Sequence, residues 1–252
     1  MAFARGQTWP NATIPYEIDS NDFPVDSPER NAIDRAISEW NDNTVIRLVH
    51  HSTENDFFVF EDIDDPSRQC DSKVGRVGGR QSLNCDLEGG VFAAGNLMHE
   101  LGHTVGFLHE HQRPDRVNFV QVGSSNNANC ALVQNGRLLT DYDCDSIMHY
   151  PSGTVTCGDI VPIASGCSGI GQAMRADAHL SGRDVWGASL LYGIPMHSIV
   201  VWEDDSAAQG SFDVHASGQS QKGQRCCGPL PINRFVGNQQ RTPEVGLDGD
   251  RN

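Results

Sequence analysis

Three observations predict an α+β fold for this sequence. Residues 9–61 read as strand, helix, strand and strand, a beginning shared by α/β and α+β folds. Residues 91–105 and 181–192 carry apolar side chains at helical spacing. The long stretch between these two helices is rich in Asn, Gly, Ser and Pro, which predicts loops. We therefore expect few regular elements in the second half of the chain.

The N-terminal elements follow from prolines, a cap and apolar periodicity. Residues 9–18 contain two prolines, which exclude a helix and favour an extended segment with a short strand. A helix is predicted over residues 28–41, because Ser27 can cap it and a proline occupies its first position. Its apolar face comprises Ile33, Ala36, Ile37 and Trp40. Residues 44–49 and 56–61 are rich in β-branched and aromatic side chains and predict strands.

A glycine cluster lies between two cysteines in residues 70–85. Its run G-R-V-G-G-R lacks the G-K-[ST] ending of a phosphate-binding loop, so we do not interpret it as one. We expect a loop that leads into an exposed edge strand. An extended peptide can pair with such an edge, main chain to main chain.

The stretch from His99 to His109 reads H-E-L-G-H-T-V-G-F-L-H. His99 and His103 are four residues apart, so both imidazoles project from one helix face and can hold one metal ion. Glu100 is rotated by about 100° from His99 and can reach a water on that metal without being a ligand. Gly106 permits a sharp turn that brings His109 round as a third ligand. Three neutral nitrogens leave Zn²⁺ an open position, as catalytic sites require.

The helix that carries this motif is predicted over residues 91–105. Its buried side comprises Val91, Ala94, Leu97, Met98 and Leu101. His111, which follows the third histidine by two residues, is interpreted as a surface histidine. Residues 118–122 predict a short strand, residues 123–145 mostly loop with room for one short helix, and residues 151–169 a long loop.

The chain changes in character after residue 193. A closing helix is predicted over residues 181–192, and its cap and apolar contacts are expected from Ser181, Val185, Trp186, Leu190 and Leu191. Residues 198–202 and 211–216 are strand-like and predict a hairpin, which is marginal in water by itself. We therefore divide the chain into a domain over residues 1–193 and a partial β-repeat module or tail over residues 194–252.

Composition limits the class of partner and the compartment. The formal net charge is −15, which argues against nucleic acid as a partner. No apolar run approaches the length of a membrane span. Eight cysteines suit a secreted protein in an oxidising compartment, although eight free thiols are the alternative. The first residues, M-A-F-A-R-G-Q-T, lack the apolar core of a secretory signal, so we expect a removed signal and pro-segment or another export route.

Several blocks in one order make the chain similar to the astacin family of zinc metalloendopeptidases. They are W-P-N-A-T-I-P-Y, then C-x4-G-R-x-G-G-x-Q-x-L-x-C, the zinc motif extended to H-E-H-Q-R-P-D-R, S-I-M-H-Y, I-G-Q and L-S-x-x-D. The resemblance covers residues 7–193. It implies a metzincin-like catalytic domain of two lobes, the first a twisted mixed sheet with long helices and the second mostly irregular.

The resemblance implies a role for each residue of the motif. His99, His103 and His109 would ligate one catalytic zinc ion, and Glu100 would be the general base that works on a zinc-activated water. Tyr150 would be an extra zinc ligand that swings away to stabilise the transition state. The alternative for Tyr150, from the residues alone, is a core tyrosine with a satisfied hydroxyl.

Further positions follow from the same resemblance. Met148 would lie in a turn beneath the metal, and Glu110 would anchor the N-terminus of the matured enzyme. The strand around residues 75–81 would form the substrate rim, with Gly75, Arg76, Val77, Gly78, Gly79, Arg80 and Gln81. Cys70 and Cys85 would form a disulfide. Spacing alone suggests further pairs, Cys130 with Cys144 and Cys157 with Cys167, and leaves Cys226 and Cys227 unassigned.

The tail and the partners complete the predictions. Residues 194–252 are similar to a repeat of large bacterial surface and secreted proteins, so we expect a bacterial-type member of the family. The acids of the tail could bind calcium, with a solvated turn as the alternative. We expect a monomer that acts on protein or peptide substrates. Two other functions stay open: a binding or adhesion module with a structural zinc site, and a metal-dependent hydrolase of another bond.

Overall fold

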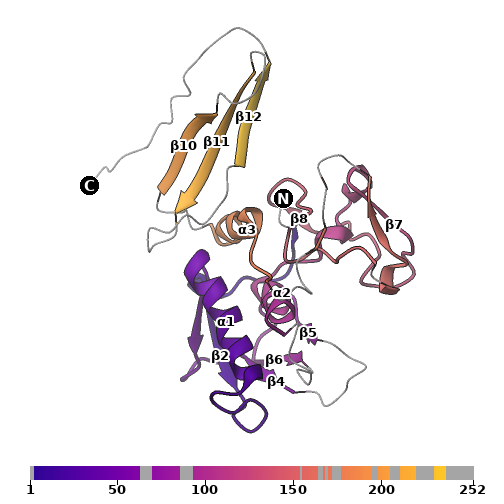
Figure 1. Cartoon of the computed structure of the whole chain (residues 1–252). Helices are drawn as coiled ribbons and strands as arrows, with labels where there is room; N and C mark the ends of the chain where they lie inside the picture. The colour runs from indigo at the N-terminus through magenta and orange to yellow at the C-terminus, as the bar shows by residue number, and fades with distance from the viewer. Residues whose placement is uncertain are drawn as a thin grey trace.

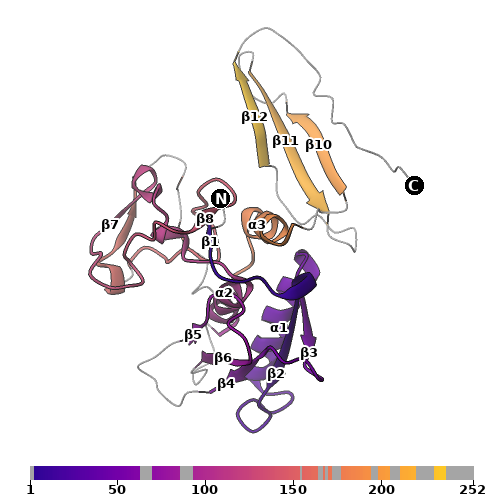
Figure 2. The ribbon, with the colours of Figure 1, turned by 180° about the vertical axis from the view of Figure 1, so that it is seen from behind.

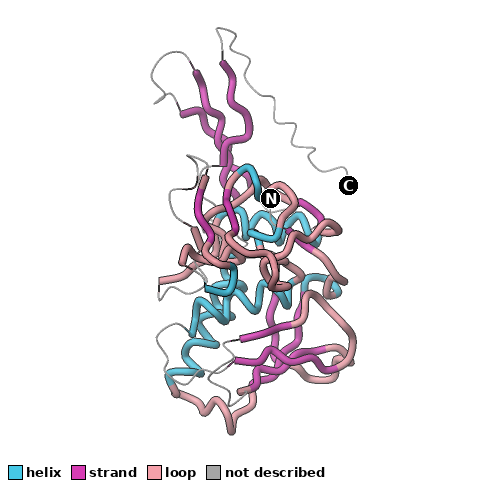
Figure 3. Tube along the Cα trace, turned by 90° about the vertical axis from the view of Figure 1, so that its right-hand side faces the viewer, coloured by secondary structure: helices cyan, strands magenta, loops and turns pink. Residues whose placement is uncertain are grey.

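A computed structural model describes residues 3–62, 70–85, 93–153, 155–163, 167, 170–171, 177–193, 198–204, 211–219 and 230–236. Helix α2 (Ala93–Val105) lies at the centre of the first 193 residues (Figure 1). The strands within residues 13–85 lie on one side of the helices, and most of the loops lie on the other side with a few short strands among them, as the view turned by 90° also shows (Figure 3). We call residues 13–105 the sheet lobe and residues 109–193 the loop lobe.

A five-stranded mixed sheet forms the sheet lobe. Its strands are β2 (Thr13–Ile18), β3 (Arg47–His50), β4 (Phe57–Glu61), β5 (Cys70–Ser72) and β6 (Arg80–Cys85). They lie in the order β3-β2-β4-β6-β5, and every neighbouring pair is parallel except β5 with β6 (Figure 2). Alternate residues of β6, Gln81, Leu83 and Cys85, are buried, as the two-residue period of a strand requires.

Helix α1 (Pro28–Asn43) forms as the cap and the apolar spacing predicted. The Ser27 hydroxyl accepts a hydrogen bond from the Arg30 amide at 3.0 Å, and the predicted apolar face is buried. Trp40 Nε1 donates to the Met98 carbonyl at 3.0 Å and so joins α1 to α2. The strand predicted from residue 44 begins three residues later. Thr44 instead closes the helix, because its hydroxyl donates to the Trp40 carbonyl at 2.7 Å.

The loop lobe has short elements joined by irregular chain. They are η2 (Glu110–Gln112), η3 (Arg116–Asn118), β7 (Val120–Val122), β8 (Arg137–Leu138), η4 (Val155–Cys157), β9 (Ile160–Pro162) and α3 (Gly182–Tyr192). β7 pairs with β9, whereas β8 pairs with the N-terminal β1 (Phe3–Ala4). A 3₁₀ turn, η1 (Pro10–Ala12), precedes β2. Residues 123–145, which the structure describes throughout, contain β8 and no helix.

Three disulfides close these lobes. Cys70 bonds Cys85, as the resemblance implied. The other two bonds join Cys130 with Cys157 and Cys144 with Cys167, so the pairs suggested by spacing were wrong. The cysteines nearest in sequence do not pair, because β7 and β9 pair and bring distant loops together. The Ser124 amide donates to the Cys157 carbonyl at 2.7 Å as part of this contact. The cysteines at 226 and 227 lie outside the described residues.

Helix α3 begins with a capping box and ends at a left-handed glycine. The Ser181 hydroxyl accepts from the Asp184 amide, while the Asp184 carboxylate accepts from the Ser181 amide. Val185 and Leu191 are buried as predicted, but Leu190 is 40% exposed. The prediction for Leu190 was wrong because the buried face of α3 follows Val185, Ala188 and Leu191, and Leu190 lies about 100° away from it.

Beyond residue 193 the described strands form an antiparallel sheet. β10 (Ser198–Asp204) pairs with β11 (Ser211–Gln219), which confirms the predicted hairpin. β12 (Leu230–Val236) adds a third strand that the sequence did not predict. The boundary at residue 193 stays a prediction. Among the helices of the described residues, none has the length and apolar character needed to cross a membrane.

Candidate metal centre

Three buried histidines converge at the end of α2. His99 and His103 are one helical turn apart, with ring centroids 4.8 Å from each other. The chain then reverses at Gly106, whose φ of 121° is open only to glycine, and His109 returns to the same point. One donor atom of each histidine lies within 4.8 Å of the others. The structure thus brings together the three residues that the motif predicted.

A hydrogen bond at Nδ1 of each histidine leaves Nε2 as the nitrogen that faces the other rings. Nδ1 of His99 donates to the Ile147 carbonyl at 2.8 Å, and Nδ1 of His103 donates to the Phe107 carbonyl at 2.8 Å. Nδ1 of His109 lies 2.9 Å from Oε1 of Gln112. Each Nε2 atom therefore keeps its lone pair, and the Nε2 atoms of His103 and His109 lie 3.2 Å apart. Histidines that bind a metal usually donate their other ring N–H to an oxygen in this way, which fixes the tautomer and the ring orientation.

Burial keeps these imidazoles neutral. It lowers the pKa of His99 to about 3, with the neighbouring His103 as the next cause, and the pKa of His103 to about 4. The pKa of His109 is lowered well below its usual value, first by burial and then by the other histidines. A neutral imidazole is the form that binds metal, so the cluster is ready to accept a cation.

Glu100 supplies the clearest sign that the site fits a metal. Its Oε2 atom is the one buried side-chain polar atom without a hydrogen-bond partner among the described residues. Burial, and secondarily the charge of Asp71, raises the pKa of Glu100 to about 8. An unpartnered carboxylate oxygen beside three nitrogen lone pairs suits a divalent cation with a water. Nitrogen donors with one open position fit Zn²⁺.

The segment 146–150 forms the floor of the cluster. Asp184 of α3 accepts hydrogen bonds from the Ser146 hydroxyl at 2.6 Å and from the Ile147 amide at 2.8 Å. Met148 is buried against α2 so closely that a Cβ at Gly102 would overlap its sulfur. Helix α3 thereby holds the turn whose Ile147 carbonyl orients His99.

Tyr150 lies beside the cluster and not in the core. Its ring centroid is 4.6 Å from that of His109 and 5.9 Å from that of His99. Burial, followed by the charge of Glu100, raises its pKa to about 12, so the phenol stays protonated and can donate a hydrogen bond.

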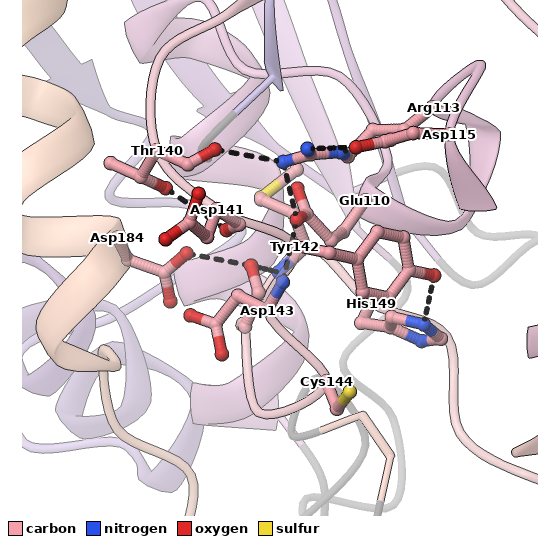
Figure 4. A network of polar contacts seen from close by, with 12 residues as sticks. Glu110, Arg113, Asp115, Thr140, Asp141, Tyr142, Asp143, Cys144, His149 and Asp184 are labelled. Atoms are coloured by element: carbon pink, nitrogen blue, oxygen red, sulfur yellow. Dashed lines mark hydrogen bonds and ion pairs between the residues drawn. The ribbon is translucent and has the colours of Figure 1, made fainter. Parts of the chain in front are cut away.

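Glu110 lies next to the third histidine but belongs to a separate polar network (Figure 4). Its Oε1 accepts from Arg113 Nη1 at 2.9 Å and from the Asp143 amide at 2.8 Å. Burial raises its pKa to about 8, although Arg113 opposes this. Tyr142 completes the network through a 2.8 Å hydrogen bond to His149. Its arrangement serves to hold the loop lobe together around the metal site.

The prediction that His111 is a surface histidine was wrong. The ring is fully buried, Nε2 donates to the Asn129 carbonyl at 2.8 Å, and Nδ1 accepts from the Tyr150 amide at 3.4 Å. Sequence analysis also missed Gln112, which contacts His109. Both follow His109 in a 3₁₀ turn, η2, that no pattern predicted, and that turn directs them inward.

The predicted substrate rim differs from the structure. Residues 75–79 form a loop, and Arg80 and Gln81 begin β6, which lies between β4 and β5. Residues 75–79 therefore do not form the predicted strand. Arg80, Gln81 and Ser82 pair with β4, while β5 pairs only with residues 83–85 of β6, so the substrate rim stays a prediction. The loop still borders the motif, since the Gly75 amide donates to the His103 carbonyl at 2.8 Å.

The rest of this loop is fixed by hydrogen bonds. Arg76 pairs with Asp56 at 2.5 Å, and its amide donates to the Gln7 carbonyl at 2.9 Å. The side chain of Gln81 is buried, and its Oε1 accepts from the Val77 amide at 3.1 Å. Val77 itself is 59% exposed, and Gly78 and Gly79 both have positive φ. The loop thus presents its outer face to solvent beside the metal motif.

Comparisons with known proteins match this geometry. The sequence profile described as Astacin (Peptidase family M12A) matches residues 2–193. A relative named zinc metalloproteinase nas-8, from Steinernema carpocapsae, is 39% identical over 153 residues, which are 57% of this chain and 34% of that protein. Human tolloid-like protein 1 is 34% identical over 205 residues, 74% of this chain and 19% of that protein. The chain thus spans a third or less of these relatives.

A solved structure resembles the fold as well. High choriolytic enzyme 1, a hatching enzyme zinc-protease from the medaka Oryzias latipes, aligns with a TM-score of 0.61 and 31% identity, covering 75% of this chain and 94% of that one. These relatives come from animals, so the comparisons do not support the expected bacterial type. The fold, the histidine cluster and the match over residues 2–193 agree, and the chain belongs to the astacin family, peptidase family M12A.

Proposed function

We propose that this chain is a secreted zinc endopeptidase that hydrolyses peptide bonds of protein substrates. One observation carries the proposal: three histidine nitrogens converge at α2, and Glu100 of the same helix has a buried Oε2 without a hydrogen-bond partner. Family membership supports it, and three disulfides suit an oxidising compartment. A monomer, and a calcium site in the tail, remain predictions.

The chemistry divides between a metal and the residues around it. His99, His103 and His109 would hold Zn²⁺, which when bound supplies Lewis acidity toward the scissile carbonyl and lowers the pKa of water. Glu100 is placed to take a proton from the attacking water on Oε2 and to pass it to the leaving amine. Its pKa of about 8 without a cation matches an acid–base group that works near neutral pH.

Tyr150 is proposed as the donor to the developing oxyanion. Its phenol remains protonated because burial raises its pKa to about 12. It could alternatively approach the metal as an extra ligand and leave when substrate binds. Met148 has a packing role only, since it fills the space beneath α2 and contacts Gly102.

An extended substrate is proposed to pair with β5. This strand is the edge of the sheet, and α2 packs directly against it. The Ser72 hydroxyl lies 2.8 Å from that of Thr104, which places the strand beside the helix turn that follows Glu100. A peptide that adds to this edge would run antiparallel or parallel to β5 with its main chain near the metal site.

The test is digestion of a proteome-derived peptide library, read by mass spectrometry. The disulfide-bonded chain loaded with zinc should cleave peptides, and a chelator or Glu100→Ala should abolish cleavage. Zinc binding without cleavage, equal in Glu100→Ala, would support a binding module with a structural zinc site. Turnover of esters without peptides would indicate a hydrolase of another bond.

A further inference from the structure

A closed turn over residues 127–131 contacts His111 and Gln112, which follow the third histidine. The Asn127 carbonyl accepts from the amides of Cys130 at 2.9 Å and Ala131 at 3.1 Å, and the Asn127 side chain accepts from the Asn129 amide at 2.8 Å. The disulfide from Cys130 to Cys157 ties the turn to η4. We call residues 127–131 the tethered turn.

The tethered turn determines how the Gln112 amide is oriented. Gln112 Nε2 donates to the Ala128 carbonyl at 2.7 Å and to the Ala131 carbonyl at 3.1 Å. These bonds use both amide hydrogens, and carbonyl oxygens can only accept. A flipped amide would place oxygen against two oxygens, so Oε1 is the atom that faces His109 Nδ1 at 2.9 Å. The side chain of Gln112 is buried, which strengthens this preference.

The orientation of Gln112 selects the tautomer of His109. An amide oxygen accepts only, so Nδ1 must carry the proton and Nε2 keeps the lone pair directed at the cluster. His99 and His103 are oriented differently, by main-chain carbonyls of Ile147 and Phe107. Among the three histidines, His109 alone is oriented by a side chain, and a point substitution can therefore remove its partner.

We propose that Gln112 is a positioning residue for the metal ligand His109 and that the tethered turn holds it in register. This rests on the proposed function, because it takes His109 as a zinc ligand. The same turn reaches Tyr150 through His111, since the Asn129 carbonyl accepts from His111 Nε2 at 2.8 Å and His111 Nδ1 accepts from the Tyr150 amide at 3.4 Å. Two groups of the site thus share one support in the loop lobe.

Zinc affinity tests the inference independently of activity. We would measure the dissociation constant by chelator competition and record the visible spectrum of the Co²⁺-substituted chain. Gln112→Ala should raise the dissociation constant for zinc by about 10- to 100-fold, the usual effect of losing such a partner. It should also alter the Co²⁺ spectrum. Gln112→Glu should retain part of the affinity, because a carboxylate still accepts from His109 although it cannot donate to the turn.

The second disulfide of the loop lobe provides a matched control. Removing the tether with Cys130→Ala and Cys157→Ala should weaken zinc binding as Gln112→Ala does. Adding Gln112→Ala to the tether variant should lower zinc affinity little further. Cys144→Ala with Cys167→Ala should leave zinc affinity within about twofold. If the tether variant does not fold, Asn127→Ala loosens the turn with the disulfide in place and should weaken zinc in the same direction.

The outcomes separate this inference from the proposed function. A wild-type chain that binds zinc and cleaves peptides, with unchanged affinity in Gln112→Ala, would overturn the role of Gln112. Equal losses in the two disulfide variants, or additive losses with Gln112→Ala, would overturn the role of the tethered turn. A wild-type chain that binds no zinc would overturn the proposed function, and this inference with it.

Discussion

The two lobes hold their parts of the metal site by different physical means. His99 and His103 stand on α2, whose other side is packed into an apolar core with Leu97, Met98 and Leu101. His109 and Tyr150 stand on loops, and hydrogen bonds and the Cys130–Cys157 disulfide hold those loops. Apolar packing thus holds the site residues of one lobe, and polar contacts hold those of the other.

The difference teaches where each lobe is vulnerable. A packed core tolerates exchange of one apolar side chain for another of similar volume, but not the loss of volume. A buried polar network tolerates little, because removing one partner leaves another unsatisfied. Glu110, Arg113 and Asp143 form such a network in the loop lobe. Substitutions in the apolar core of the sheet lobe should therefore affect mainly stability. Substitutions in the loop lobe should affect function where they remove a group beside the histidine cluster, and stability elsewhere.

Trp40→Ala should give the largest loss of stability. Trp40 is fully buried between α1 and α2, so its removal leaves a cavity and takes the side-chain donor from the Met98 carbonyl. We expect the free energy of unfolding to fall by about 3–5 kcal/mol, measured by denaturant titration. Val25→Ala, at a side chain 72% exposed, should change it by less than about 0.5 kcal/mol. A loss below about 1 kcal/mol for Trp40→Ala would contradict the packing account.

Tyr150→Phe should lower the catalytic rate and leave the stability of the fold nearly unchanged. Losing a donor to the oxyanion is expected to lower kcat by about 10²- to 10³-fold, measured with a peptide substrate under saturating zinc. Tyr142→Phe is the matched control in the same lobe, because it removes the 2.8 Å hydrogen bond to buried His149. That variant should lose about 1–3 kcal/mol of stability with little change in kcat. Similar kcat values for Tyr150→Phe and wild type would remove Tyr150 from the mechanism.

His149 should make the loop lobe sensitive to acid. Burial lowers its pKa to about 4 from an ordinary 6.5. Between these values the unfolded chain binds a proton that the folded chain does not, so stability falls as pH decreases from 6.5 to 4. The contribution is about 3 kcal/mol. Unfolding of the metal-free His149→Gln variant should show a weaker pH dependence than wild type over this window, and parallel curves would contradict the assignment.

Removing the helix caps should have the smallest effect on stability, and the caps of α1 and α3 compare the two lobes directly. Ser27→Ala removes only a cap at the surface, for about 1 kcal/mol of stability and no change in kcat. Ser181→Ala removes a cap that also donates to Asp143 at 2.5 Å, so it should cost more and lower kcat as well. Thermal unfolding and steady-state kinetics check both. If Ser27→Ala cost as much as Ser181→Ala, the contrast between the lobes would not hold at their helix ends.

Sequence patterns predicted the sheet lobe better than the loop lobe, for a physical reason. Periodicity and capping are local, so Ser27, the apolar face of α1 and the spacing of His99 and His103 could be read directly. Pairing of β7 with β9 is not local, and it decided which cysteines met. The burial of His111 depended on the turn after His109, which carries no periodic signal.

The substrate rim shows the same limit inside the sheet lobe. The glycine cluster correctly predicted a loop, and the strand-like residues after it form β6. Which strand is the edge depends on the order of pairing, and the short β5 leaves no clear alternation over three residues. A resemblance placed the loop beside the motif, but only the fold shows that β5 pairs with no more than residues 83–85 of β6.

The contact between Gly102 and Met148 has a consequence for anyone who would stabilise this protein. Replacing a glycine within a helix by alanine usually gains about 0.5–1 kcal/mol. At position 102 the added methyl group would displace the methionine sulfur, and the turn that carries it also presents the carbonyl that orients His99. A substitution ranked as favourable by helix propensity would here weaken the metal site, so an optimised α2 must keep the glycine at position 102.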